Sequence, residues 1–363
     1  MACTGARVAK VFKNNIFSSS LSALIRNPQL NNSLFIKCRH LSSTTTEIDN
    51  DRDPAPLFFN SEVQSMLKTL TRVDLKKVYR ERKDGAKLEP PTYKFMTNEE
   101  LEAALNEAKT TAELRLQMPP VVKKKQETPA IISADPALQG YDTSRIIFTD
   151  ISFGITNLNR LIVVRDTDGT LRNANEKERQ RLNQVYFPIE GREIDTPKLF
   201  QKEYLTDLLN REEYEFVLNI ACVQFEPNDP EYHEITGTVY SHVNSCKHFD
   251  HLRSTRHYGP LVFYLAWYRE VDKLLLENIE TGRLDDAVLL VQLYYKIHPT
   301  SASAEVEFDG DELKFIQSYI DNDSNMKCTL ELAVQSYIDL ENAKREVNEG
   351  IKKAHVSNTN IRY

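Results

Sequence analysis

The hydrophobic pattern of this chain has the period of strands in only one stretch, and that limits the folds open to it. From Arg145 to Arg172 apolar and polar residues alternate as in a half-buried strand, and Leu161 to Val164 forms a second apolar run. Beyond Thr196 the apolar residues recur at helical spacing. The expected helices cover 200–211, 213–225, 230–244, 257–280 in one piece or two, 283–298 and 328–355. The pattern predicts an α+β, mainly α-helical protein with one small antiparallel β-hairpin region.

Two arrangements of these helices stay open. Gly282 to Pro299 places Gly, Ala and Pro where the second helix of a tetratricopeptide unit has them, which favours an irregular helical-hairpin stack. A single unit is also compatible with a plain helical bundle, because such repeats normally occur three or more together. Upstream, Thr97 and Glu100 have capping-box spacing and predict a helix that stops at Pro119. The prolines around that helix predict extended, Pro-rich N-terminal segments.

The N-terminal segment differs in composition from the rest. Residues 1–46 contain three Arg and three Lys, no acidic residue, and many Ser, Thr and Asn, as in a mitochondrial transit peptide. Arg39 to Ser42 resembles a matrix-protease cleavage site, so residues 1–41 are expected to be removed in the mitochondrial matrix; a disordered basic tail is the alternative. Losing six basic residues from a chain of net charge −7 leaves −13. An acidic mature protein is expected to contact RNA only locally.

The remaining boundaries follow from composition. We expect a disordered linker at 42–57, an extended and helical N-terminal arm at 58–136, the β-hairpin region at 137–199, a helical core at 200–299, an acidic loop at 300–325, and a C-terminal helix and tail at 326–363. Lys123 to Lys125 and the residues after them are interpreted as a second linker. The longest apolar run, Leu261 to Tyr268, is too short to span a membrane, so no membrane is expected as a partner.

One short stretch suggests chemistry. Asp166 and Asp168, after an apolar strand, match the first loop of haloacid-dehalogenase phosphatases, where the first Asp is the nucleophile and the second an acid and base beside Mg²⁺. The parallel sheet and the downstream Mg²⁺-binding acidic pair of those enzymes are missing from the pattern. Asp favours turns, and Gly169 can adopt positive φ. We therefore interpret the stretch as a hairpin turn and expect no enzyme activity.

Other polar clusters are weaker signals. Cys246, His248, His251 and His257 match no standard zinc spacing, and we expect polar contacts at a helix junction rather than a metal. Cys222 is expected in the core. No nucleotide-binding or hydrolase motif is present, so no cofactor and no small-molecule substrate are predicted. The basic groups that can neutralise RNA phosphates are Lys76, Lys77, Arg80, Arg82, Lys83, Lys123, Lys124, Lys125, Arg253 and Arg256.

Several ordered phrases resemble one family. These are EVQSML, PPTYKFMT, LRLQMPPV, FTDIS, RLIVVR, GTLRNANEKER, QVYFPIEGRE, VLNIACVQFEP, HLRSTRHYG and DDAVLLVQLYYKIHP. From about Phe58 to Pro299 the chain resembles the mitochondrion-specific ribosomal protein twenty-two family of the small subunit. The resemblance implies a non-catalytic constituent of the mitochondrial ribosome that supports subunit assembly and translation. Its partners would be other small-subunit proteins and, locally, the small-subunit rRNA. A non-ribosomal helical-repeat adaptor of the matrix is the alternative.

Overall fold

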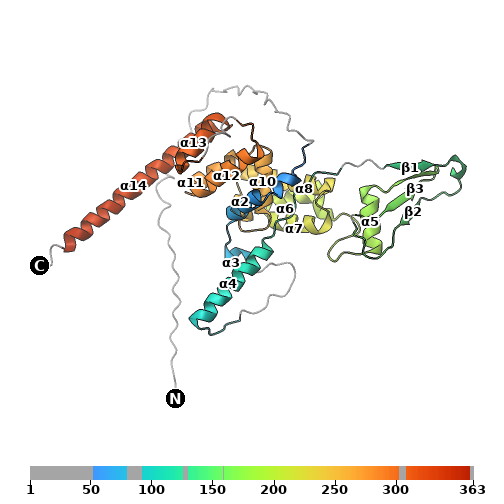
Figure 1. Cartoon of the computed structure of the whole chain (residues 1–363), viewed down its shortest axis with the longest axis horizontal. Coiled ribbons are helices and arrows are strands. Elements are labelled where there is room, and N and C mark those ends of the chain that lie inside the picture. The colour runs from blue at the N-terminus through green and yellow to red at the C-terminus, as the bar shows by residue number, and fades with distance from the viewer. Residues whose placement is uncertain (1–51, 80–91, 126–129, 158, 302–307, 360–363) are drawn as a thin grey trace, which may run out of the picture. The chain divides into compact units, whose positions relative to one another are not determined.

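Helices make up most of the chain that the computed structural model describes, as the helical spacing predicts. The described residues are 52–79, 92–125, 130–157, 159–301 and 308–359 (Figure 1). In chain order the helices are α1 (Ala55–Phe58), α2 (Ser61–Thr71), α3 (Leu75–Val78), α4 (Asn98–Arg115), α5 (Glu176–Tyr186), α6 (Lys202–Asn210), α7 (Tyr214–Gln224), α8 (Pro230–Cys246), α9 (Phe249–Leu252), α10 (Tyr258–Trp267), α11 (Asp272–Glu280), α12 (Leu284–Ile297), α13 (Glu312–Asn322) and α14 (Lys327–Thr359). Two short 3₁₀ turns, η1 (Pro136–Leu138) and η2 (Lys198–Phe200), complete the helical elements.

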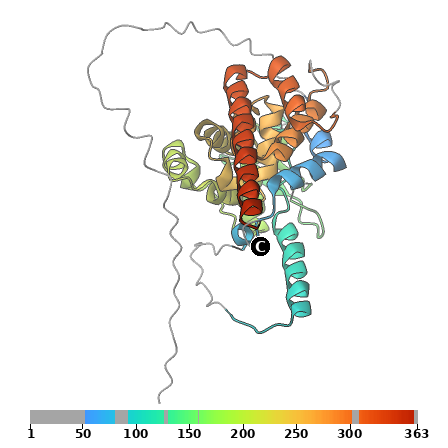
Figure 2. The same ribbon diagram turned by 90° about the vertical axis from the view of Figure 1, so that its left-hand side faces the viewer.

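The hydrophobic core is centred on α10 and α12. α10 is apolar on nearly all sides, and a helix of that kind must be enclosed by others. α2 packs on both α10 and α12, and α11 and α13 also pack on α12. α11 and α12 form a helical hairpin around Gly282, whose φ of +71° ends the first helix. The long α14, red in Figure 2, packs against α11 and α13.

The expected helix at 257–280 is broken into α10 and α11 at Tyr268–Val271. Arg269 adopts a left-handed φ of 58°, and the amide of Glu270 donates back to the carbonyl of Leu265 at 2.8 Å. This closes α10 and turns the chain, so that α11 can return. The hairpin-stack interpretation therefore holds for this part of the chain.

The acidic loop expected at 300–325 is wrong where α13 occupies Glu312–Asn322. Asp311 caps this helix by accepting from the amide of Lys314. Phe315, Ile316 and Tyr319, which lie on one face, are buried. Composition misled the prediction here, since the acidic residues of α13 lie outside its buried face.

The expected β-hairpin region is a four-stranded antiparallel sheet of order β1-β4-β3-β2. Its strands are β1 (Ile131–Ala134), β2 (Ile146–Thr149), β3 (Ile162–Arg165) and β4 (Thr170–Asn173). β3 and β4 form the predicted hairpin, β2 pairs with β3, and β1 lies upstream of the expected boundary at 137 and pairs with β4. All four residues of β1 are exposed, so its sequence lacks the alternation of apolar and polar residues that marks a half-buried strand. β1 was therefore not predicted.

The N-terminal boundaries also change. The linker expected at 42–57 already contains the first residues of α1, and the part before residue 52 lies outside the described residues. α2 belongs to the helical core rather than to an arm, since Val63, Leu67 and Leu70 are buried in it. The capping box of Thr97 and Glu100 is confirmed at the start of α4. Among the described residues no helix combines the length and the apolar character needed to cross a membrane.

Candidate nucleic-acid interface

The segment that carries three successive lysines is clamped onto the helical core. Met118 lies so close above Gly259 of α10 that any Cβ there would overlap its Sδ. Val121 packs against the core, and the amide of Lys125 donates to the carbonyl of Asn228 at 2.9 Å. Residues 118–125 therefore have a defined path, and the interpretation of Lys123 to Lys125 as part of a linker is wrong. The core supplies the order that the local sequence lacks.

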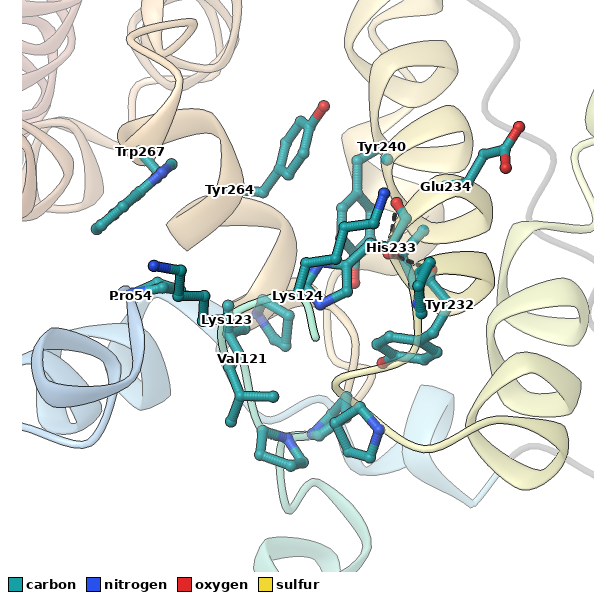
Figure 3. Close-up of a pocket in the computed structure, with 18 of the residues that line it drawn as sticks. Pro54, Val121, Lys123, Lys124, Tyr232, His233, Glu234, Tyr240, Tyr264 and Trp267 are labelled. Atoms are coloured by element: carbon teal, nitrogen blue, oxygen red, sulfur yellow. Dashed lines mark hydrogen bonds between the residues drawn. The ribbon is translucent and has the colours of Figure 1, made fainter. Parts of the chain in front are cut away.

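This segment forms one wall of an open groove of about 1100 Å³. α8 and α10 form the other walls, and Figure 3 shows Lys123 and Lys124 on the segment between Trp267 on one side and His233 on the other. We call this the lysine–aromatic groove. Its basic residues are Arg52, Lys123, Lys124, Lys125 and Lys177, and its aromatic residues are Tyr232, Tyr240, Phe263, Tyr264, Trp267 and Tyr268.

The cations of the groove are not equivalent. Lys125 forms an ion pair with Glu176 at 2.8 Å, and Lys177 forms one with Glu231 at 3.0 Å. Burial, and then the positive charge of Lys124, lower the pKa of His233, so this imidazole adds no charge at neutral pH. Lys124 is exposed, as is Arg52. The positive potential of the groove therefore comes mainly from residues near its open side.

The aromatic residues of the groove were missed at the sequence level. Tyr264 and Trp267 on α10 and Tyr268 at its C-cap are three and four residues apart, so one face at the end of that helix presents all three. Their signal was present inside the apolar run Leu261–Tyr268, which excludes a membrane span and predicts a helix but does not indicate a binding surface. The spacing by itself does not distinguish a buried aromatic face from one that lines a groove.

Arg253, expected to contact RNA, is buried instead. Only 4 % of it is exposed, and its guanidinium lies 3.3 Å from Asp250, 3.3 Å from Glu277 and 3.6 Å from Asp286. It also lies over the ring of Tyr258, at 4.9 Å from the ring centroid. A phosphate could reach this guanidinium only by displacing carboxylates from the protein interior, which is costly. We therefore leave Arg253 out of the candidate interface.

The other predicted basic residues are dispersed. Arg256 donates to Asn219 at 3.0 Å and lines a separate, smaller cavity of about 370 Å³ between α7 and the segment after α4. Lys76 and Lys77 are exposed on α3, where Lys77 contacts Asp250 at 3.3 Å. Arg80, Arg82 and Lys83 lie outside the described residues. The structure thus brings together Lys123, Lys124 and Lys125 but does not join them to the other two groups.

The Asp166–Gly169 stretch is confirmed as the turn of the β3–β4 hairpin. The amide of Gly169, at φ +86°, donates to the carbonyl of Asp166 at 3.0 Å. Asp168 accepts from the amide of Thr170 at 2.9 Å, and this hydrogen bond lowers the Asp168 pKa. The Asp166 carboxylate accepts from the guanidinium of Arg172 at 2.7 Å. Both carboxylates therefore stabilise the hairpin.

The Cys246–His257 stretch forms polar contacts at a helix junction. The hydroxyl of Tyr214 lies 3.1 Å from Nδ1 of His242 and 2.9 Å from Nδ1 of His248. Burial raises the Tyr214 pKa to about 12, so its proton is retained at neutral pH. Nε2 of His251 lies 3.2 Å from Glu212. His257, fully buried, contacts Asn219 at 2.9 Å.

The surroundings of Cys222 and the geometry of possible metal ligands can also be described. Cys222 is half-buried on α7 and packs against the core, where burial raises the pKa of its thiol. Its sulfur lies 3.6 Å from the hydroxyl of Tyr232. Within the part of the chain that the structure describes, no group of three or more His, Cys, Asp or Glu has metal-binding geometry.

Comparison with known proteins identifies the family. Residues 56–299 match the family model described as mitochondrial 28S ribosomal protein S22. The chain is 37% identical over 302 residues to small ribosomal subunit protein mS22 of Bos taurus, which covers 83% of each chain. It is 36% identical over 304 residues to the Mus musculus protein of the same name, with 83% of this chain and 84% of that protein covered. The matched region contains the sheet, α2 to α12 and the lysine–aromatic groove except for its N-terminal edge. The chain therefore belongs to the mitochondrial 28S ribosomal protein S22 family.

Proposed function

We propose that this protein is a structural constituent of the mitochondrial small ribosomal subunit, working in the mitochondrial matrix, and that it supports subunit assembly and mitochondrial translation. Its contacts are with other small-subunit proteins and, locally, with the small-subunit rRNA. The observation that supports a local RNA contact is the clamped lysine segment. An acidic protein holds Lys123 and Lys124 at fixed positions beside a large open groove.

The proposal divides the surface by charge. A mature net charge of −13 repels a polyanion in general, while it favours the basic surfaces of other ribosomal proteins. RNA contacts are then confined to basic islands, of which the lysine–aromatic groove is the first and Lys76 with Lys77 on α3 the second. The role is non-enzymatic, since the two aspartates with enzyme-like spacing serve a hairpin.

Sedimentation of matrix lysate on a density gradient tests the assignment. The full-length protein is expected in the fraction that contains small-subunit rRNA, and its depletion is expected to lower both that peak and organellar protein synthesis. Recovery of the intact protein only at the top of a low-salt gradient would contradict the ribosomal role. That result would favour the free matrix adaptor.

A variant series in the same gradient tests the local contact. Lys123→Glu with Lys124→Glu is expected to reduce incorporation, more strongly as salt is raised, because each phosphate contact contributes to the salt dependence. Lys198→Glu with Lys202→Glu is the matched control, since both lysines are exposed and neither lines the groove. Equal incorporation of the two double variants would contradict an RNA contact at the lysine segment.

A further inference from the structure

The aromatic wall of the groove is arranged in a way that a core would not require. Tyr268, the C-cap of α10, is 38 % exposed, and Tyr264 and Trp267 are half-buried, although the other residues of α10 are almost fully buried. The rings of Tyr264 and Tyr268 lie 4.5 Å apart, and Tyr264 is 5.3 Å from Tyr240. Large aromatic rings that stay partly exposed side by side, next to a buried Tyr240, indicate a binding surface.

Cations stand beside these rings. Lys123 and Lys124 follow each other on an extended backbone, so their side chains leave it in different directions, and the guanidinium of Arg52 lies 5.4 Å from the ring of Trp267. Two carboxylates also line the groove, of which Glu231 is neutralised by Lys177 and Glu234 is exposed. The groove therefore places cations that can bind the phosphates of a polyanion next to aromatic rings on which bases can stack.

We propose that the lysine–aromatic groove binds a single-stranded segment of RNA, with bases against Tyr268 and Tyr264 and phosphates along Lys123 and Lys124. This inference rests on the proposed ribosomal function and specifies its RNA contact. Unpaired bases have faces that aromatic side chains can stack on, whereas the bases of a duplex are stacked on each other and hidden. The groove holds a strand without sequence preference, because every base has a face to stack.

Two other occupants fit the groove less well. At about 1100 Å³ it is open and larger than the roughly 300–1,000 Å³ of small-molecule sites, which bury most of their ligand. An acidic peptide would satisfy the lysines, but its carboxylates gain nothing from the exposed ring of Tyr268 and the half-buried ring of Tyr264 beside it. RNA is the partner that uses both the lysines and the tyrosines.

The chain contains a built-in reporter for this test. Trp267 is its only tryptophan and lines the groove, so its fluorescence reports on this site alone. In a titration of the purified full-length protein with a ten-nucleotide oligouridine, we expect a saturable change in tryptophan emission. A duplex RNA of the same length should bind at least several-fold more weakly. The logarithm of the association constant should fall with the logarithm of salt concentration with a slope of about −2, for about three cations on a single strand.

Variants separate stacking from charge. Tyr268→Ala should weaken oligouridine binding about tenfold, and Tyr268→Phe should restore it, because stacking on an aromatic ring is lost in the first and kept in the second. Lys123→Glu with Lys124→Glu should weaken binding and reduce the salt slope, and Lys198→Glu with Lys202→Glu should do neither. Circular dichroism of each variant checks that the helices are intact.

Several results would overturn the inference. These are no emission change with oligouridine, equal affinity for duplex and single strand, an oligouridine affinity that Tyr268→Ala leaves unchanged, or preferential binding of a ten-residue polyglutamate peptide. Failure of the groove and failure of the ribosomal role give different outcomes. If the protein co-sediments with the small subunit and the groove variants also incorporate, only the groove inference fails. If the protein stays away from small-subunit rRNA, the proposed function fails whatever the purified protein binds.

Discussion

Replacing Gly169 with alanine tests how the β3–β4 turn is built. Gly169 has a φ of +86°, and a Cβ on it would overlap the backbone carbonyl oxygen of Asp135. Asp135 begins the η1 turn after β1, and its amide donates to the carbonyl of Gly169 at 3.2 Å. The overlapping atom is backbone rather than the end of a flexible side chain, so it cannot move aside without breaking this link between β1 and the turn.

The expected cost has two parts. Placing a residue with a Cβ at positive φ costs about 1–2 kcal/mol. Forcing additional volume into a filled site costs about 1–3 kcal/mol more. Gly154 separates the two, because its φ is +83° and a Cβ there would meet nothing within 4 Å. Gly154→Ala should therefore show the first cost alone, and Gly169→Ala should exceed it by about 1–3 kcal/mol.

Native-state hydrogen exchange is the appropriate assay, because the sheet can open without unfolding the helical core. The amides to follow are those of Asp135 and Asp166, which donate to Gly169 and Thr170. Gly169→Ala should lower the opening free energy at both. Asp166→Asn should preserve the turn, since Asn is also a good turn residue, at the cost of its ion pair with Arg172. Equal losses in Gly169→Ala and Gly154→Ala would refute the steric reasoning.

Three further predictions concern pH, packing and import. Burial raises the pKa of Asp229 from 3.8 to about 6, so between about pH 4 and 6 the folded state keeps a proton that the unfolded state has released. The unfolding free energy should therefore fall as pH rises through this range, by at most about 3 kcal/mol. Asp229→Asn should remove that fall in urea titrations at each pH. Leu290 is fully buried on α12, whereas Leu289 is partly exposed. By chemical denaturation, Leu290→Ala should lower the unfolding free energy by about 2–5 kcal/mol and Leu289→Ala by clearly less. Equal losses would contradict the packing. Mass spectrometry of the mature protein should place its N-terminus close to Ser42, and a mature chain that still starts at Met1 would contradict the transit-peptide prediction.

Several elements could be predicted from the sequence because their signals are local. The capping box of Thr97 and Glu100 satisfies amides within one turn, and the positive φ of Gly169 serves a turn of four residues. The helices α6, α7, α8, α10, α11 and α12 follow the spacing of their own apolar residues, whereas the short α9 was not predicted. The error at α13 was one of weighting, since Phe315 and Tyr319 had helical spacing but the surrounding acidic residues dominated the interpretation.

The site was harder to predict because its residues are distant in sequence. Lys123 to Lys125 were identified as basic residues, but whether they lie in a linker or in a wall depends on Asn228 and Gly259. The tyrosines at the end of α10 were visible as part of an apolar run, with no local sign of which ring stays at the surface.

The sequence by itself determined the mainly helical class, the hairpin turn, the acidic balance and the family resemblance. Only the tertiary structure decided that Arg253 is buried among carboxylates while Lys124 stays exposed beside a groove. Both are basic residues in polar stretches, and the one nearby carboxylate that pairs with Arg253, that of Asp250, does not by itself bury it. Backbone hydrogen bonds and caps act over one turn, so a short window of sequence contains them. Burial and ion pairing are set by whatever the fold places opposite a side chain, and for Arg253 those groups include Glu277 and Asp286, which are remote along the chain.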